Sequence, residues 1–414
     1  MVDAVICGFL ADNDPLMPPY FRTVRNWCRR TTSLKRGQTM PLILMDEASR
    51  DVNGVYCSDF GARLDGCIAM TVFISVLGLF CLAALLLIPW PVIDRTFADV
   101  PPDDADLRFV EVAKICGDDG HCRTVADIIA RKSNSARRAM FFDGLTDGFE
   151  SEVPLIRPKN ATVDDSDTRL WHVDHGTLLN EYVAAMALMP FLVGSLTVRS
   201  DGYGLSSADE LADVAIVGLG GGSLDAFLHL KFPWFNITVY ERDVSVVELA
   251  KQWFDISDDR TRRTVIGDGV IAISEHAGKG DHLNAIILDA CDFSPYISCP
   301  AAPFITLEML RKAKSALRPL GVFVLNVLPA TQRDEERTVA LLQQKLLSVF
   351  PLCARMKMGR QLNSVFACLP YAASARDRND LVRLWQQRKD EVGRLLRLQT
   401  LLQGSRLTIG GPSY

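Results

Sequence analysis

The chain has 414 residues, of which 48% are hydrophobic and 23% are charged, so it can bury a sizeable core and is not globally disordered. Its formal net charge of −5 at pH 7 offers no basic surface to a polyanion. The composition therefore excludes nucleic acid from the expected partners.

The first distinctive region is an apolar stretch near the N-terminus. Residues 1–66 mix proline, arginine and small polar residues without sustained periodicity, and we expect a disordered tail there. The next 22 residues, Cys67–Ile88, read CIAMTVFISVLGLFCLAALLLI, and ~20 helical residues are enough to cross a bilayer. We predict a transmembrane helix at residues 67–90 and a single-pass membrane protein, with a buried core helix as the alternative.

The orientation in the membrane stays open, because Lys and Arg are balanced on the two sides of the apolar stretch. Basic residues between Arg22 and Arg36 favour a cytosolic N-terminus, but residues 109–138 carry a comparable basic load. The sequon NAT at Asn160 offers a test, since glycosylation there would place the body of the chain in a lumen. The second sequon, at Asn236, leads into a predicted strand and should be shielded.

Residues 91–136 read as a linker or stem that leaves the membrane, beginning with PVIDRTFADVPPDDAD. They include CGDDGHC, in which Cys116, His121 and Cys122 are closely spaced and can be imagined as zinc ligands. No second pair of ligands follows, so we expect no metal. A solvated loop and, in an oxidising compartment, a local disulfide remain the alternatives.

Residues 137–200 are predicted to form a small N-terminal β element and a helix. Short apolar runs at Arg137–Gly144 and Glu152–Ile156 indicate strands, and Thr177–Val193 has helical spacing.

Residues 201–372 alternate apolar, strand-like runs with helical ones. The predicted strands are Val214–Gly218, Ile237–Glu241, Thr264–Gly267, Ala285–Leu288, Val322–Asn326, Cys353–Met358 and Ser364–Leu369. The predicted helices are Ser223–Lys231, Val244–Phe254, Val270–His276, Ile305–Leu317 and Arg337–Phe350. This alternation predicts an α/β fold with a doubly wound, mostly parallel, seven-stranded Rossmann-like sheet. Residues 373–414 are predicted to be a C-terminal helix, over Asp377–Gln403, and a tail.

The strongest chemical signal is DVAIVGLGGGSLDAF, where a buried strand runs through a glycine loop directly into a helix. The loop contains Gly218, Gly220, Gly221 and Gly222. Glycine lets the backbone pass close to a ligand at the carboxyl edge of a sheet, where such folds bind cofactors. A tight turn without a ligand is the alternative interpretation.

Three acids follow successive predicted strands, and parallel strands bring their carboxyl ends to one edge. These acids are Glu241, Asp268 and Asp289. Repeated carboxylates would repel a diphosphate but suit an adenosine cofactor with a sulfonium centre, so we expect S-adenosylmethionine. For each acid the alternative is a helix N-cap.

At this point the residues resemble a family. The motifs VGLGGGSL, YERD, SCPAAPFI and LRPLGVFVLN, with VDHGTLLNEY upstream, resemble the C-terminal domain of the methyltransferase-like protein 13 family, which methylates elongation factor 1-alpha. The resemblance covers roughly Arg137 to Pro370 and implies a class I methyltransferase fold. Because the family's substrate is cytosolic, a luminal catalytic domain could not reach it.

The same domain is similar to spermidine synthases, in which an Asp-x-x-Asp motif follows the equivalent strand. DACD, Asp289–Asp292, fits that spacing, and in those aminopropyltransferases the first acid helps to deprotonate the attacking amine. Their polyamine-holding Tyr-His-Glu stretch is not recognisable here, which favours methyl transfer.

We therefore expect a membrane-anchored methyltransferase of the transferase class that acts on an amine, either a protein N-terminus or lysine, or a small molecule. Asp289 and Asp292 are the candidate catalytic residues, Asp289 also contacting the cofactor, while Glu241 and Asp268 hold ribose and adenine. A catalytically inactive scaffold is the alternative from another class. Beyond its substrate, the expected partners are the membrane, through Cys67–Ile88, and a second copy of the chain in a homodimer.

Overall fold

The structure, a computed structural model, describes residues 107–117, 122–142, 151–200, 205–206, 212–280, 282–292, 296–330, 335–372 and 378–410. The predicted tail and the predicted transmembrane helix at residues 67–90 lie outside these ranges. Within the described ranges, no helix is both long enough and apolar enough to span a membrane.

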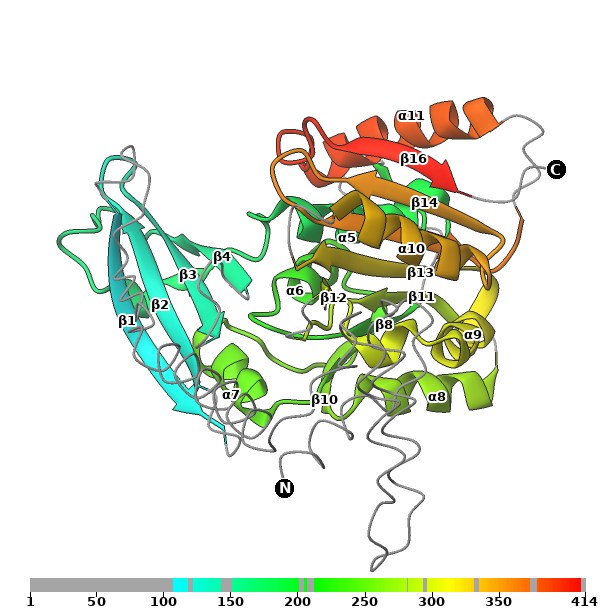
Figure 1. Cartoon of the computed structure of the whole chain (residues 1–414). Helices are drawn as coiled ribbons and strands as arrows, with labels where there is room; N and C mark the ends of the chain where they lie inside the picture. Colours follow the sequence, from blue (N-terminus) through cyan, green and yellow to red (C-terminus); the bar gives the residue numbers. More distant parts are fainter. Residues whose placement is uncertain are drawn as a thin grey trace, which may run out of the picture. The chain divides into compact units, whose positions relative to one another are not determined.

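A small antiparallel sheet comes first in the chain (Figure 1). Its strands, in sheet order, are β1 (Leu107–Cys116), β2 (Cys122–Ala130), β3 (Ser135–Phe142), β4 (Ser151–Ile156) and β5 (His172–Val173).

The prediction of a linker over residues 91–136 is therefore wrong from Leu107 onward. Strand β1 is exposed at Arg108, Glu111 and Lys114, so its charges break the apolar run that marks a strand in sequence. A cross-strand ion pair hides in β2 and β3, where buried Asp127 accepts hydrogen bonds from Arg138. The exposed charges of β1 and the buried Asp127 of β2 interrupt the apolar pattern of these two strands, which is why the sequence predicted a stem there.

The central sheet has the order β10-β9-β8-β11-β13-β15-β14-β16. Its parallel strands are β10 (Arg262–Ile266), β9 (Asn236–Glu241), β8 (Asp213–Val217), β11 (Leu283–Leu288) and β13 (Leu317–Pro329). The antiparallel strands are β15 (Ser364–Leu369), β14 (Leu352–Lys357) and β16 (Arg406–Gly410), and short β12 (Ile297–Cys299) pairs with the end of β13. The predicted doubly wound, mostly parallel sheet is confirmed.

Strand β16 is an addition to the seven predicted strands, because it pairs with β14 along the sheet edge. It lies in the segment that was predicted to be a helix and tail. The helix α11 (Arg378–Leu396) ends before the predicted Gln403, and Arg397 takes a positive φ of 60° where the chain turns back. The central domain consequently extends to Gly410.

Helices cover both faces of the central sheet. Val214 and Ile216 of β8 belong to one apolar core with α5 (Glu181–Val193), α6 (Ser223–Lys231), α7 (Val244–Trp253) and α11. Ala215 and Val217 belong to a second core with α8 (Gly269–Lys279), α9 (Leu307–Ala316) and α10 (Glu335–Leu347). This alternation follows from the two-residue period of a strand. The remaining short elements are β6 (Arg199–Ser200), β7 (Leu205–Ser206), η2 (Thr168–Leu170) and η3 (Ala302–Ile305).

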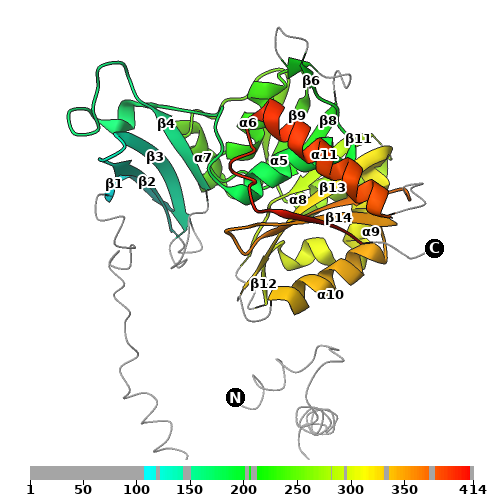
Figure 2. The ribbon, with the colours of Figure 1, turned by 90° about the horizontal axis from the view of Figure 1, so that it is seen from above.

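Helix α5 is apolar on all sides, and 12 of its 13 residues are buried. It packs between α11 and strands β13 and β15, and the two helices lie side by side in Figures 1 and 2. A helix of this kind belongs to the interior of a domain rather than to its surface.

Candidate functional site

The glycine loop joins β8 to α6 at the carboxyl edge of the central sheet. Gly218 has a φ of +99°, and a Cβ built there would lie 2.4 Å from the carbonyl oxygen of Asp289. A Cβ at Gly221 would lie 2.7 Å from the ring of Phe254 and 3.0 Å from Ser151 Oγ. A side chain at Gly218 would collide with the backbone of Asp289, and one at Gly221 would collide with the side chains of Phe254 and Ser151. Gly220 and Gly222 also take positive φ.

The small sheet packs against the glycine loop through Ser151. Ser151 begins β4, and the β sheet is fixed to α7 by Arg138, whose Nη1 donates to the carbonyl oxygen of Trp253 at 2.7 Å. Arg123 of β2 also pairs with Asp243, at the start of α7. Figures 1 and 2 both show the small sheet beside α7. The N-terminal β element thus belongs to the site.

Glu241 ends β9 next to the glycine loop. Its Oε2 accepts a hydrogen bond from Leu219 N at 3.0 Å, and its Oε1 accepts one from Asp243 N at 2.9 Å. Asp243, rather than Glu241, is the N-cap of α7. The capping alternative therefore fails for Glu241, and its half-buried carboxylate fixes the loop while keeping lone pairs for a ligand.

Asp268 has a different environment at the end of β10. It is exposed, and its Oδ1 accepts a hydrogen bond from Val270 N at 2.7 Å as the N-cap of α8. The capping alternative thus holds for this acid, and only its second oxygen remains for a ligand.

Asp289 follows β11 and carries the most unusual electrostatics of the site. Its Oδ1 accepts a hydrogen bond from Asn326 Nδ2 at 2.9 Å. Burial raises the pKa of Asp289 to about 6, and the hydrogen bond from Asn326 opposes that rise. The half-buried carboxyl group of Asp289 caps none of the described helices.

Asn326 and Asn363 form an amide relay behind Asp289. Asn363 Nδ2 donates to Asn326 Oδ1 at 2.8 Å, and both side chains are buried. Sequence reasoning missed both residues. The available signal was Asn326 itself, a polar residue inside the otherwise apolar strand GVFVLNV.

The turn that carries Asn363 is also tied to the start of α5. Buried Glu181 accepts a hydrogen bond from Arg360 N at 2.8 Å, and Gln361 Nε2 donates to Asn180 Oδ1 at 3.1 Å. The segment VDHGTLLNEY, which resembles the family, is therefore hydrogen-bonded to the turn that carries Asn363.

Asp292 lies in the loop after Asp289, where its Oδ2 accepts a hydrogen bond from Ala302 N at 3.1 Å. Its own N–H donates to Ser298 O, so the acid helps to close the loop between β11 and β12. The structure brings Asp289, Glu241 and the glycines together at one edge and gives Asp292 a clear loop-closing contact.

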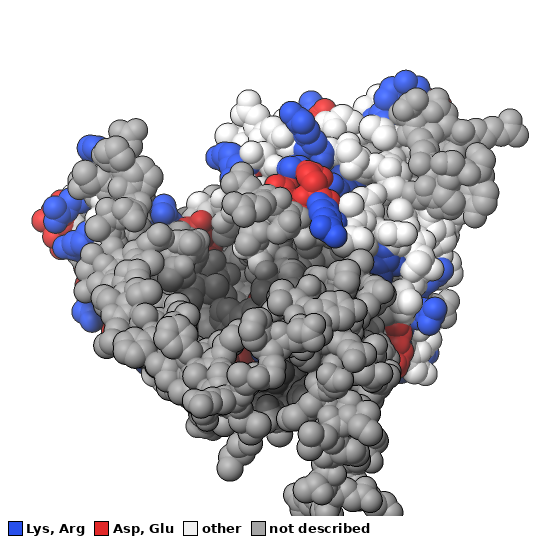
Figure 3. Space-filling view, viewed as in Figure 1, with Lys and Arg blue, Asp and Glu red and all other residues white. Residues whose placement is uncertain are grey.

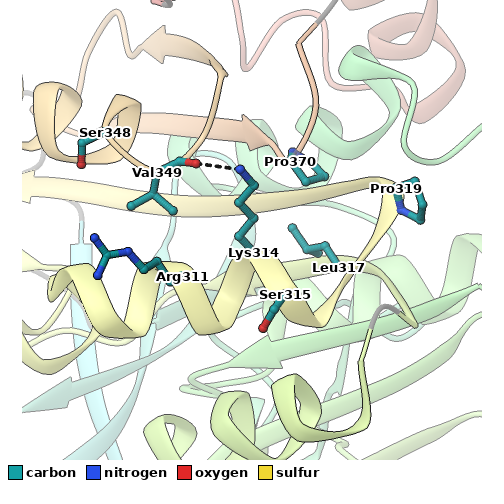
Figure 4. A pocket seen from close by; sticks show the side chains of 8 residues that line it. All are labelled: Arg311, Lys314, Ser315, Leu317, Pro319, Ser348, Val349 and Pro370. Atoms are coloured by element: carbon teal, nitrogen blue, oxygen red, sulfur yellow. Dashed lines mark hydrogen bonds between the residues drawn. The ribbon is translucent and has the colours of Figure 1, made fainter.

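A separate groove of about 570 Å³ lies at the amino end of β13 (Figure 4). It is lined by Arg311, Lys314, Ser315, Leu317, Pro319, Ser348, Val349 and Pro370. Lys314 Nζ donates to Val349 O at 2.9 Å across it. Asn326 lies toward the other end of the same strand, so the groove is distinct from the glycine-loop site.

On the face in Figure 3, acidic and basic side chains of the described residues are interspersed. Among the described residues, Glu335 and Glu336 pair with Lys357. The acidic residues that distinguish the described part of the chain are therefore Glu241, Asp268 and Asp289 at the carboxyl edge of the central sheet.

The strand order and the glycine loop beside Glu241 define a Rossmann-like methyltransferase sheet. No family model matches the chain. The eEF1A lysine and N-terminal methyltransferase homolog of Drosophila melanogaster is 35% identical over 163 residues, which make up 39% of this chain and 24% of that protein. The resemblance to the methyltransferase-like protein 13 family is thereby confirmed, and the aligned part spans about a quarter of the relative's length.

Two further likenesses were found. The polyamine aminopropyltransferase of Vibrio vulnificus is 31% identical over 113 residues, 27% of this chain and 36% of that protein. The crystal structure of human methyltransferase-like protein 13 in complex with SAH is 28% identical with a TM-score of 0.40, and the match covers 52% of this chain and 90% of that one.

Proposed function

We propose that the chain is an S-adenosylmethionine-dependent methyltransferase that acts on an amine. The observation that carries the proposal is Asp289, a half-buried acid that is held by Asn326, lies close in space to Gly218 of the glycine loop, and has a raised pKa. The similarity to named eEF1A methyltransferases supports the same activity.

The residues at the carboxyl edge fit the cofactor. The loop around Gly218 and Gly221 leaves room for no side chain. The N–H groups of Gly218, Leu219 and Gly222 already donate within the protein, so those of Gly220 and Gly221 would be the donors for a carboxylate. Glu241 would hold the ribose hydroxyls, and Asp268 would accept from the adenine through the oxygen not used in the cap. When bound, S-adenosylmethionine supplies a methyl group on a sulfonium centre.

Asp289 has two tasks in this scheme. Its Oδ1 is held by Asn326, which leaves Oδ2 to accept a proton from the attacking amine. A pKa of about 6 lets this carboxylate be ionised at neutral pH and still act as a base, because a general base works best with a pKa near the working pH. The remaining contribution is positioning of the amine in line with the methyl group.

Equilibrium binding of S-adenosylhomocysteine, measured by calorimetry, tests this proposal. We expect saturable binding with one site per chain. No saturable binding would remove the basis for an enzyme and favour the scaffold.

The second candidate is an aminopropyltransferase, which the DACD motif and the similarity to the Vibrio vulnificus enzyme favour. It predicts tighter binding of decarboxylated S-adenosylmethionine and formation of spermidine from putrescine. A methyltransferase should bind the intact cofactor more tightly, because the N–H donors of Gly220 and Gly221 would lose their partner without its carboxylate. Competition calorimetry with the two cofactor forms separates the candidates.

The methyl acceptor and the membrane complete the proposal. We infer that the acceptor is a protein N-terminus or lysine, the groups named for the relatives.

We also infer that Cys67–Ile88 anchors the chain in a membrane, since it is 22 residues of uncharged apolar sequence. Deleting residues 1–92 should give a soluble protein that keeps its secondary structure by circular dichroism. Aggregation with loss of that signal would show that the stretch belongs to the core.

A further inference from the structure

Every cysteine within the described residues lies in a disulfide. The three pairs are Cys116–Cys122, Cys291–Cys299 and Cys353–Cys368. No cysteine of this region is left over, which is the pattern of a chain that folds where thiols are oxidised.

Each pair closes a different part of the fold. Cys116 and Cys122 are register partners at the loop end of the β1–β2 hairpin, where they flank the connection between the two strands. Cys353 and Cys368 are partners across β14 and β15, and both are fully buried. Cys291 and Cys299 join the two arms of the loop that follows Asp289. The pairs therefore depend on three independent strand or loop pairings of the native fold.

A second, independent feature points to the same compartment. Asn160 of the sequon NAT lies on an exposed turn after β4 and has a φ of +64°. Asn236, in the other described sequon, is half-buried in β9, where its Nδ2 donates to Asp213 Oδ1 at 2.6 Å. The sequon at Asn160 is thus the one that the fold presents to solvent.

We propose that the folded body of the chain, residues 107–410, resides in the oxidising lumen of the secretory pathway, with three disulfides and an N-linked glycan on Asn160. The proposal selects one of the two orientations that the balanced flanking charges leave open. It also places the methyl acceptor on the luminal side, so the acceptor is a luminal protein or amine rather than a cytosolic elongation factor. Only this last consequence rests on the proposed methyltransferase activity.

Both modifications need a co-reactant, and the lumen of the secretory pathway supplies one for each. For each pair, two thiols lose two protons and two electrons to a disulfide-bearing oxidant, which becomes a dithiol, and one S–S bond forms. At Asn160, Nδ2 forms a bond to the first sugar of a lipid-diphosphate-linked oligosaccharide and loses a proton, while the lipid diphosphate leaves.

The thiol test uses the full-length wild-type chain expressed in eukaryotic cells. Free thiols are blocked with iodoacetamide during lysis, and peptides are mapped by mass spectrometry without reduction. We expect linked peptides for all three pairs and no alkylation at Cys353 or Cys368. Alkylated thiols at the three pairs would overturn the proposal.

A matched control removes the route into the membrane. Deleting residues 67–90 should keep the chain in the reducing cytosol, and the same six cysteines should then be alkylated once the protein is denatured in the presence of the reagent. Persistence of the linked peptides in this variant would contradict the dependence on compartment.

The glycan test compares electrophoretic mobility before and after digestion with an N-glycosidase. Wild type and Thr162→Ser, which keeps the sequon, should shift, whereas Asn160→Gln and Thr162→Ala should not. A wild-type chain without a shift, or a shift that survives in Asn160→Gln, would overturn the assignment. Neither test measures turnover, so failure here leaves the proposed methyl transfer intact, and failure to bind S-adenosylhomocysteine leaves the compartment intact.

Discussion

The ends of β10 and β11 present the same signal in sequence but different environments in the structure. Each strand ends at the carboxyl edge of the sheet and is followed by an aspartate. Asp268 is exposed and caps α8, whereas Asp289 is half-buried, accepts from Asn326 and has a pKa raised to about 6. An acid at a strand end is therefore only a candidate, and a raised pKa without a capping role distinguishes Asp289, the proposed base.

The largest expected effect tests Asp289 directly. Asp289→Asn keeps the size and one acceptor but removes the base, so we expect methyl transfer to fall ~100-fold or more. The cofactor dissociation constant, measured by calorimetry, should change by less than about tenfold. An equal fall in thermal stability with unchanged turnover would make Asp289 a structural residue like Asp268.

Glu241→Ala should have the next largest effect. Loss of a charged acceptor for two hydroxyls predicts ~2–4 kcal/mol weaker cofactor binding. Glu241 also accepts from Leu219 N and Asp243 N, so the melting temperature should fall as well. Glu241→Gln keeps one acceptor and should be milder in both measurements. An unchanged dissociation constant in Glu241→Ala would reject the ribose assignment.

The amide relay should have a smaller effect on Asp289. Asn363→Ala leaves Asn326 free to turn, and loss of a buried partner costs ~1–3 kcal/mol of folding free energy. We expect kcat to fall about tenfold with little change in cofactor affinity. Gln361→Ala, which cuts the neighbouring bond to Asn180 but not the relay, is the control. Equal kcat in the two variants would remove the positioning role of Asn363.

The raised pKa of Asp289 can be tested by two independent measurements, the pH dependence of stability and the pH dependence of kcat/KM. Because the folded-state pKa of Asp289 is raised, the unfolded chain releases that proton first. The free energy of unfolding should fall as pH rises from about 4 to about 6, and kcat/KM should rise through about pH 6. Asp289→Asn should remove both trends, measured as the difference from wild type. A difference that is flat over this window would show that the Asp289 carboxyl is not desolvated.

Asp268 should show the smallest effect. Asp268→Asn keeps the cap, because Asn and Asp are comparable N-caps, while Asp268→Ala should cost ~1 kcal/mol of stability. Cofactor affinity in Asp268→Asn should fall about fivefold, the effect of one neutral hydrogen bond. A fall above about a hundredfold would place Asp268 with Asp289 and erase the contrast between the two strand ends.

Much of the central sheet was readable because its parallel strands are buried on both faces. Such strands appear as uninterrupted apolar runs, and the predicted Ala285–Leu288 lies within β11. Strands β1 and β16 were missed because they are edge strands that carry exposed charges, and β2, an inner strand, was missed because buried Asp127 interrupts its apolar run. Hydrophobic pattern alone does not separate such strands from a linker.

Only part of the candidate site could be predicted from the sequence, and the reason differs from that for the strands. The glycines and acids could be placed because strand ends meet at one edge. The relay could not, because Asn326 and Asn363 are 37 residues apart and meet only through the antiparallel pairing of β13 and β15. The cysteine pairs depend on the register of facing strands in the same way, and the sequence left even the nearest pair, Cys116 and Cys122, open.

Helix α5 has a consequence for the order in which the protein can be made. It appears in the middle of the chain, yet its outer side is covered by α11, which is synthesised near the end. Until Arg378–Leu396 has left the ribosome, a helix that is apolar all round has one side without a partner. Nascent chains paused before Arg378 should therefore recruit chaperones that bind apolar segments, and release of α11 is the step that ends this dependence.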